Sequence, residues 1–208
     1  WVALKDSLWL ACVGALLTTL LALAPAWHST YRTGSLSSII RQSTYIASAL
    51  PGVLLAFGLM CVALMISKET GGYGLMLSSG VLLWMGYATR FLAEAFGPIQ
   101  ASLHQYPAAH VDIARSLNRF PGAWLRSSLL PHLKPALVTS LLISALAILK
   151  ELPITLLLGG ATGRRTLAFR TWDRYNEAMW HDAGVSGLIL VLGSLVLTLI
   201  LLRRSEEP

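Results

Sequence analysis

Ser43 to Ile66 reads STYIASALPGVLLAFGLMCVALMI, a stretch of 24 residues without one charged side chain. A helix rises about 1.5 Å per residue, so about 20 apolar residues cross the roughly 30 Å hydrocarbon layer of a bilayer. Lipid offers no partner to backbone N–H and C=O groups, so a spanning segment must be a helix or part of a closed barrel. The stretch lacks the alternation of apolar and polar residues that barrel strands need. It therefore predicts a membrane-spanning helix.

Four further apolar runs of similar length surround this one. They are Leu8 to Trp27, Leu75 to Ala95, Ala136 to Leu158 and Val185 to Leu202. The composition agrees, because 55% of the 208 residues are hydrophobic and only 12% are charged, whereas soluble domains carry about 25% charged residues. The sequence thus predicts an all-α, polytopic membrane protein of about five transmembrane helices, with residues 1–208 forming one membrane domain.

The distribution of Lys and Arg in the loops predicts the orientation, since cytoplasmic loops are enriched in both. With five spans, the segments after the first, third and fifth share one face. That face carries Arg32, Arg41, Arg115, Arg119, Arg126, Lys134, Arg203 and Arg204. The opposite face carries Lys68, Arg164, Arg165, Arg170 and Arg174. We expect the first face to be cytoplasmic and the N-terminus of the chain to be periplasmic.

Polar residues and prolines inside the runs mark positions of special interest. Lys150 and Glu151 each cost about 2.5 to 3.5 kcal/mol inside a membrane, so they should face a cavity or a partner helix; alternatively both lie near the interface, with Lys150 reaching toward water. Pro153 removes a helical hydrogen bond and should kink or open the fourth span, exposing carbonyls beside the carboxylate. Pro51 either bends the second span in the same way or reflects ordinary helix packing, which explains it equally well.

Arg90 and Glu94 lie four residues apart in the third run. Side chains at this spacing share one face of a helix and can form an ion pair. We expect this pair to be structural.

The segment between the third and fourth runs contains a short predicted helix at 107–120. Pro107 suits the first turn of a helix, and Pro121 with Gly122 ends it. One arc of this helix is apolar and consists of Ala109, Ile113, Ala114 and Leu117. The opposite arc is polar and consists of Asp112, Arg115, Ser116, Asn118 and Arg119. Such an amphipathic helix either lies on anionic lipid or docks a partner protein.

The same segment resembles the signature loop of type I ABC importer permeases, which reads EAA, three residues, Gly, nine residues, Ile, one residue and Leu-Pro. The spacing is kept from Asp112 to Pro131, although Asp replaces Glu, Ile replaces the first Ala, Asn replaces Gly and Ser replaces Ile. The resemblance implies that 107–120 is a coupling helix that binds a cytoplasmic ATPase. The residues implied in coupling are Asp112, Ala114, Arg115, Asn118, Leu130 and Pro131.

A second resemblance covers Ala49 to Gly52, Lys150 to Leu158 and Thr166 to Ala168. These stretches are similar to iron(III)-importing permeases, whose relatives carry thiamine, phosphonates or polyamines. The resemblance implies a translocation path whose candidate residues are Lys150, Glu151, Pro153 and Thr155. It also implies alternating access, driven by a pair of cytoplasmic ATP-binding subunits. A second permease domain, fused or separate, and a periplasmic substrate-binding protein complete the expected assembly in the bacterial inner membrane.

The start of the chain at Trp1 lacks the short basic segment and brief apolar core of a cleaved signal. We expect the chain to be the C-terminal part of a longer permease, with a short complete subunit as the alternative.

Other functional classes find less support in the sequence. No phosphate-binding glycine motif occurs, so ATP hydrolysis falls to a partner and we expect no cofactor. His28, His104, His110, His132 and His181 lack close metal-ligand spacing, so no dedicated metal site is predicted. The basic residues fit membrane topology better than nucleic-acid binding. An ion-coupled carrier or channel would explain Lys150 and Glu151, but it would not explain the loop spacing.

Overall fold

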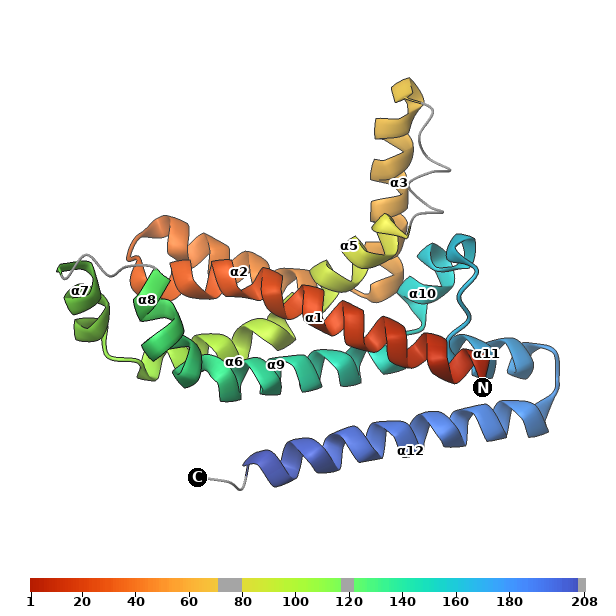
Figure 1. Ribbon diagram of the computed structural model, residues 1–208. Coiled ribbons are helices and arrows are strands. Elements are labelled where there is room, and N and C mark those ends of the chain that lie inside the picture. Colours follow the sequence, from red (N-terminus) through yellow and green to blue (C-terminus); the bar gives the residue numbers. More distant parts are fainter. Residues whose placement is uncertain (71–79, 117–121, 206–208) are drawn as a thin grey trace.

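Figure 1 shows the computed structural model, which describes residues 1–70, 80–116 and 122–205. Every regular element in these ranges is helical, which confirms the predicted all-α class. The elements are α1 (Val2–Tyr31), α2 (Ser35–Ala49), α3 (Gly52–Thr70), α5 (Val81–Arg90), α6 (Leu92–Gln105), α7 (Ala108–Ser116), α8 (Gly122–Trp124), the π-helical turn η1 (Leu125–Leu129), α9 (Leu130–Lys150), α10 (Pro153–Leu158), the 3₁₀ turn η2 (Gly160–Thr162), α11 (Leu167–Asn176) and α12 (Trp180–Ser205).

Helices α1, α6 and α9 pack side by side and form the centre of the fold. Small side chains let them approach closely, because Ala22 and Ala26 of α1 and Ala95 of α6 are all completely buried. The Ser140 hydroxyl of α9 donates a hydrogen bond of 2.8 Å to the Ala95 carbonyl. Helix association inside a membrane depends on such close packing and interhelical hydrogen bonds, since lipid is as apolar as the side chains themselves.

The described residues contain three single helices that are long and apolar enough to cross a membrane: Val2–Tyr31, Leu125–Lys150 and Trp180–Arg203. Helices α2 and α3 form a fourth candidate, bent by 108°. The predicted third span, Leu75 to Ala95, begins outside the described residues, and its described part is divided between α5 and α6 at Phe91.

Two predicted spans are not continuous helices, because each is interrupted at its proline. The second ends at Ala49, and Leu50 is extended (φ −72°, ψ 138°) immediately before Pro51, as expected for a residue that precedes proline. The fourth ends at Lys150, where Glu151 is extended (φ −73°, ψ 122°) and α10 begins at Pro153. The predicted opening at Pro153 is therefore confirmed, and of the two interpretations left open at Pro51 the structure shows the bend.

The molecule has two distinct ends (Figure 1). The short helices α7 and α8 lie at one end, together with the C-terminal end of α12. The N-terminus, α10 and α11 lie at the other end, and α3 projects away from the bundle there. This arrangement matches the predicted separation of the loop at 107–120 from the N-terminus of the chain.

Candidate functional site

Three helix interruptions meet in one place inside the bundle: the α2–α3 break, the α5–α6 break and the α9–α10 break. The Arg90 guanidinium, at the end of α5, donates a hydrogen bond to the Ser48 carbonyl of α2. Gly52, the first residue of α3, lies directly against Glu151 and Pro153. Tyr87 of α5 contacts Thr155 of α10. We call these residues the junction cluster: Ser48, Gly52, Tyr87, Arg90, Glu151, Pro153 and Thr155.

Glu151 occupies the centre of the junction cluster because the chain is extended there. Its Oε1 accepts a hydrogen bond of 3.2 Å from the Ile154 amide at the start of α10. A Cβ atom at Gly52 would lie only 2.8 Å from that same oxygen. The absence of a side chain at residue 52 thus makes room for the carboxylate between α3 and α10.

Tyr87 and Thr155 are almost completely buried, with 1% and 2% of their surfaces exposed. The Thr155 hydroxyl donates to the Glu151 carbonyl at 3.1 Å. Because its one hydrogen is used there, the Tyr87 hydroxyl is the donor in the 2.6 Å contact with Thr155 Oγ1. The pair connects α5 to α10 beside the Glu151 backbone, and it is a link that the sequence did not reveal.

The predicted ion pair between Arg90 and Glu94 is wrong. The helix is interrupted between them at Phe91 (φ −105°, ψ 12°), which removes the regular spacing on which the prediction relied. Arg90 bonds Ser48 instead, while the Arg90 Nε and the Glu94 Oε2 atom are buried without a hydrogen-bond partner. Unsatisfied polar groups at membrane depth are costly and mark functional positions.

Lys150 and Glu151 are adjacent in sequence but lie in different surroundings. Lys150 is exposed and lines a groove together with Trp172 of α11 and Trp180 of α12. Glu151 lies in the junction cluster, with Pro153 and Thr155. Of the four path candidates, the structure therefore brings three together and separates Lys150 from them.

Helix α7 falls inside the predicted coupling helix and directly follows Pro107. Val111 is 2% exposed and packs into the core around Tyr106. Ala109 and Ile113 are exposed, because two residues along a helix turn a side chain by about 200° to the opposite face. Ala109 and Ile113 of the predicted apolar arc therefore face outward, and Leu117 lies outside the described residues.

The other coupling candidates lie around α7 and the start of α9. Asp112 is exposed on α7, and Ala114 and Arg115 belong to the same helix. Leu130 and Pro131 are exposed in the first turn of α9. Asn118 lies outside the described residues.

Tyr106 joins the base of α7 to the segment that leads into α9. Its hydroxyl accepts a hydrogen bond of 3.1 Å from Trp124 Nε1 and lies 2.6 Å from Ser128 Oγ. Both contacts connect the residue before Pro107 to the α8 and η1 turns. In the sequence the only signal for this role is an aromatic residue next to the proline that begins the helix.

Replacing Tyr106 with phenylalanine is expected to lower the stability of the protein by about 1 to 3 kcal/mol, because the buried Trp124 N–H loses its acceptor. The measurement is the midpoint of thermal unfolding in detergent. Tyr45→Phe is the control, since Tyr45 is 46% exposed and should tolerate the loss of its hydroxyl. Equal midpoints for the two variants would contradict a structural role for the Tyr106 hydroxyl.

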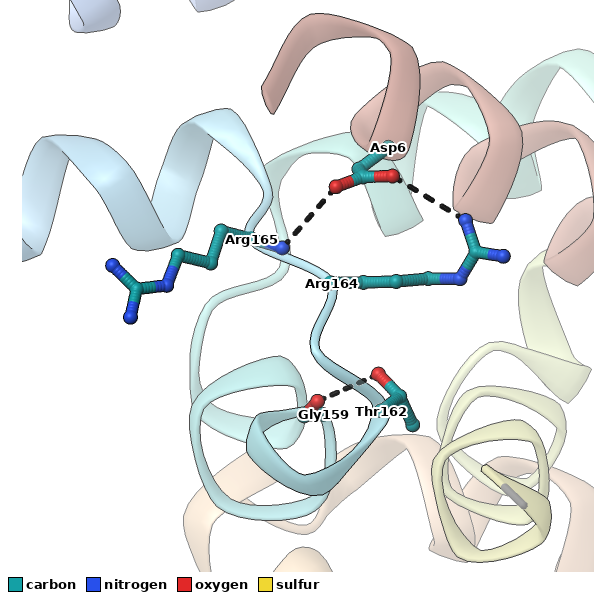
Figure 2. Close-up of polar contacts among 5 residues, drawn as sticks. All are labelled: Asp6, Gly159, Thr162, Arg164 and Arg165. Atoms are coloured by element: carbon teal, nitrogen blue, oxygen red, sulfur yellow. Dashed lines mark hydrogen bonds and ion pairs between the residues drawn. The ribbon is translucent and has the colours of Figure 1, made fainter. Parts of the chain in front are cut away.

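At the opposite end, the start of α1 holds the segment that follows α10 (Figure 2). Asp6 accepts a hydrogen bond of 3.3 Å from Arg164 Nη1 and one of 3.4 Å from the Arg165 amide. The Arg164 guanidinium also lies 3.9 Å from the centre of the Trp9 ring, and Ser7 Oγ accepts from the Leu167 amide at 2.7 Å. These contacts fix the outer end of α10, whose inner end carries the junction cluster.

The amino-acid sequence matches known proteins in two comparisons. Residues 14–204 match the family described as "Binding-protein-dependent transport system inner membrane component". The chain is also similar to the Fe(3+)-transport system permease protein FbpB 2 of Haemophilus influenzae, with 27% identity over 192 residues that cover 92% of this chain. The chain spans 37% of the length of that relative.

The family match covers nearly the whole chain and confirms three predictions. These are the permease resemblance, the inner-membrane location, and the assignment as a transport subunit in place of an enzyme. The chain therefore belongs to the family of inner-membrane components of binding-protein-dependent transport systems.

Proposed function

We propose that the chain is the permease part of an ATP-driven ABC importer that moves iron(III) from the periplasm to the cytoplasm. The observation that carries this proposal is the junction cluster, which gathers a carboxylate and hydroxyl groups where three helices are interrupted inside the membrane domain. Interrupted helices with polar groups at membrane depth are typical of substrate paths in transporters. The printed name of the Haemophilus relative supports iron(III) as the cargo.

The chemistry of the junction cluster agrees with a hard cation as cargo. Carboxylate and other oxygen ligands suit hard, highly charged metal ions. Glu151 supplies a carboxylate, and Tyr87 and Thr155 supply hydroxyls. In this proposal the cargo meets these oxygens in passing, and Arg90 balances part of the negative charge while holding α5 against α2.

In this proposal, ATP hydrolysis by partner subunits acts on the permease through α7. Two cytoplasmic ATP-binding subunits hydrolyse ATP, and one of them receives the outward face of α7 in a groove. Val111 anchors the inner face of α7 to the core, while Ile113 and Asp112 are exposed for contact. Asp112, Ala114, Arg115, Asn118, Leu130 and Pro131 form the proposed coupling surface.

The proposed assembly contains two further partners. A second permease domain completes the path, with the junction clusters of the two domains facing it. A periplasmic binding protein delivers the cargo at the end formed by α10 and α11. Alternating access then follows from movement of α10 relative to α2 and α3. Helix α10 follows α9, and α3 follows α2, after a helix interruption at which the angle between the two helices can change.

The proposal is tested by uptake of radioactive iron(III) into proteoliposomes that contain the full-length permease with its ATPase and binding protein. Uptake is expected only with ATP on the ATPase side, and excess thiamine, phosphonate or polyamine should not reduce it. If one of these compounds reduced iron(III) uptake, that compound would be assigned as the cargo in place of iron(III). Uptake that ignores ATP but follows an ion gradient would identify an ion-coupled carrier and overturn the proposal.

A further inference from the structure

A groove on the outside of the bundle runs between the end of α9, α11 and α12, and has a volume of about 570 Å³. Small residues form its floor, among them Gly184 and Gly187 of α12. Three aromatic side chains, Trp172, Tyr175 and Trp180, line one part of it. Lys150 is the one Lys or Arg residue in the lining. The groove is therefore mostly apolar and contains a single positive charge.

The position of Lys150 along α9 places it near a membrane surface. Lys134 lies near the other end of the helix, 16 residues earlier, which corresponds to about 24 Å of helix rise. With both long side chains reaching toward water, the two ammonium groups can lie at opposite boundaries of a roughly 30 Å hydrocarbon layer. Tyr175 and Trp180 are 57% and 62% exposed, as is typical of aromatic residues at the level of lipid headgroups.

The Lys150 side chain is exposed, so its ammonium is accessible to an anion from outside the protein. No acidic side chain within the described residues forms an ion pair with it. Apart from Lys150 and Thr171, the groove beside it is lined by apolar and aromatic residues. The neighbouring surface of α12 consists of exposed aliphatic side chains such as Leu188 and Val191, which suit contact with lipid chains.

We propose that this groove binds one anionic phospholipid of the outer leaflet. The phosphate pairs with the Lys150 ammonium, and Tyr175 and Trp180 flank the headgroup. One acyl chain lies along α12 over Gly184 and Gly187, where the missing side chains leave space. Since Lys150 is the last residue of α9, the bound lipid holds the helix directly beside the break at Glu151. The proposal concerns a lipid site and does not rest on the identity of the cargo.

The test uses the full-length permease in nanodiscs of phosphatidylcholine that contain a minor fraction of phosphatidylglycerol. Native mass spectrometry of the released protein measures how much phosphatidylglycerol it retains relative to phosphatidylcholine. Lys150→Gln is expected to reduce this preference by about fivefold, the effect of one basic residue near an anionic surface. Lys150→Arg should keep the preference. Lys134→Gln, an exposed lysine on the same helix that does not line the groove, should change the preference less than Lys150→Gln does.

A second variant blocks the acyl-chain part of the site. No atom lies within 4 Å of a Cβ built on Gly184, so Gly184→Leu fits the fold and fills the groove. Gly184→Leu is expected to reduce retained phosphatidylglycerol while Lys150 remains in place. Unchanged phosphatidylglycerol retention in both Lys150→Gln and Gly184→Leu would overturn the proposal. So would efficient disulfide cross-linking of Lys150→Cys to a second permease domain, because a protein partner would then occupy the groove.

Discussion

Replacing Glu151 with glutamine is expected to reduce ATP-driven iron(III) uptake by about tenfold or more. The carboxylate accepts the Ile154 amide at 3.2 Å and faces Gly52 where three helices are interrupted. Loss of a charged hydrogen-bonding group costs about 1.5 to 3 kcal/mol, and each 1.4 kcal/mol corresponds to a factor of ten. Uptake into proteoliposomes at equal permease content measures the effect.

Glu177→Gln is the matched control for this prediction. The Glu177 side chain is 52% exposed and pairs with Arg174 of α11, away from the junction cluster, so the same loss of charge should leave uptake nearly unchanged. Gly52→Ala tests the geometry separately, because its Cβ atom would displace the Glu151 carboxylate without removing it. Full uptake by both Glu151→Gln and Gly52→Ala would exclude the junction cluster from the cargo path.

Reversing the charge of Asp112 to lysine is expected to detach the ATPase and abolish ATP-driven uptake. Asp112 is exposed on α7, so the substitution should not disturb packing. Disruption of a charge pair within a protein interface costs about 2 to 5 kcal/mol, which corresponds to a loss of at least about tenfold in affinity. Co-purification with the ATPase and uptake are the two measurements.

Glu177→Lys makes the same charge reversal at the opposite end of the protein and should retain the ATPase. Ile113→Glu provides an independent test of the outward face of α7. Ile113 is 53% exposed, whereas Val111 is buried, so a polar side chain at residue 113 affects docking before it affects folding. If Asp112→Lys and Ile113→Glu both kept the ATPase bound, another surface would have to couple the two proteins.

Sequence patterns with a direct local cause were reliable guides to this structure. Pro153 lacks the amide hydrogen that a helix needs, and the interruption of the fourth span was predicted from it. A bend at Pro51 was one of two interpretations, and Pro25, Pro98 and Pro135 lie inside continuous helices. Pro107 similarly marked the start of α7 to within one residue. The long apolar runs fixed the membrane environment and the all-α class.

The junction cluster was harder to predict because it depends on tertiary placement. The predicted ion pair between Arg90 and Glu94 was wrong because the helix is interrupted at Phe91. Neither a proline nor a glycine marks this position in the sequence. No pattern in the sequence pairs Tyr87 with Thr155, which the structure brings together from α5 and α10. The separation of Lys150 from Glu151 likewise has a single cause. The backbone of Glu151 is extended, so the two adjacent side chains lie in different surroundings.

The continuous helix from Leu125 to Lys150 also has a mechanical consequence. Its first turns are joined to the base of α7 through Tyr106, and its last residue adjoins Glu151 at the break. In the proposed function, a displacement of α7 by the ATPase would reach Glu151 along this one helix, and the interruption there would let α10 change its angle.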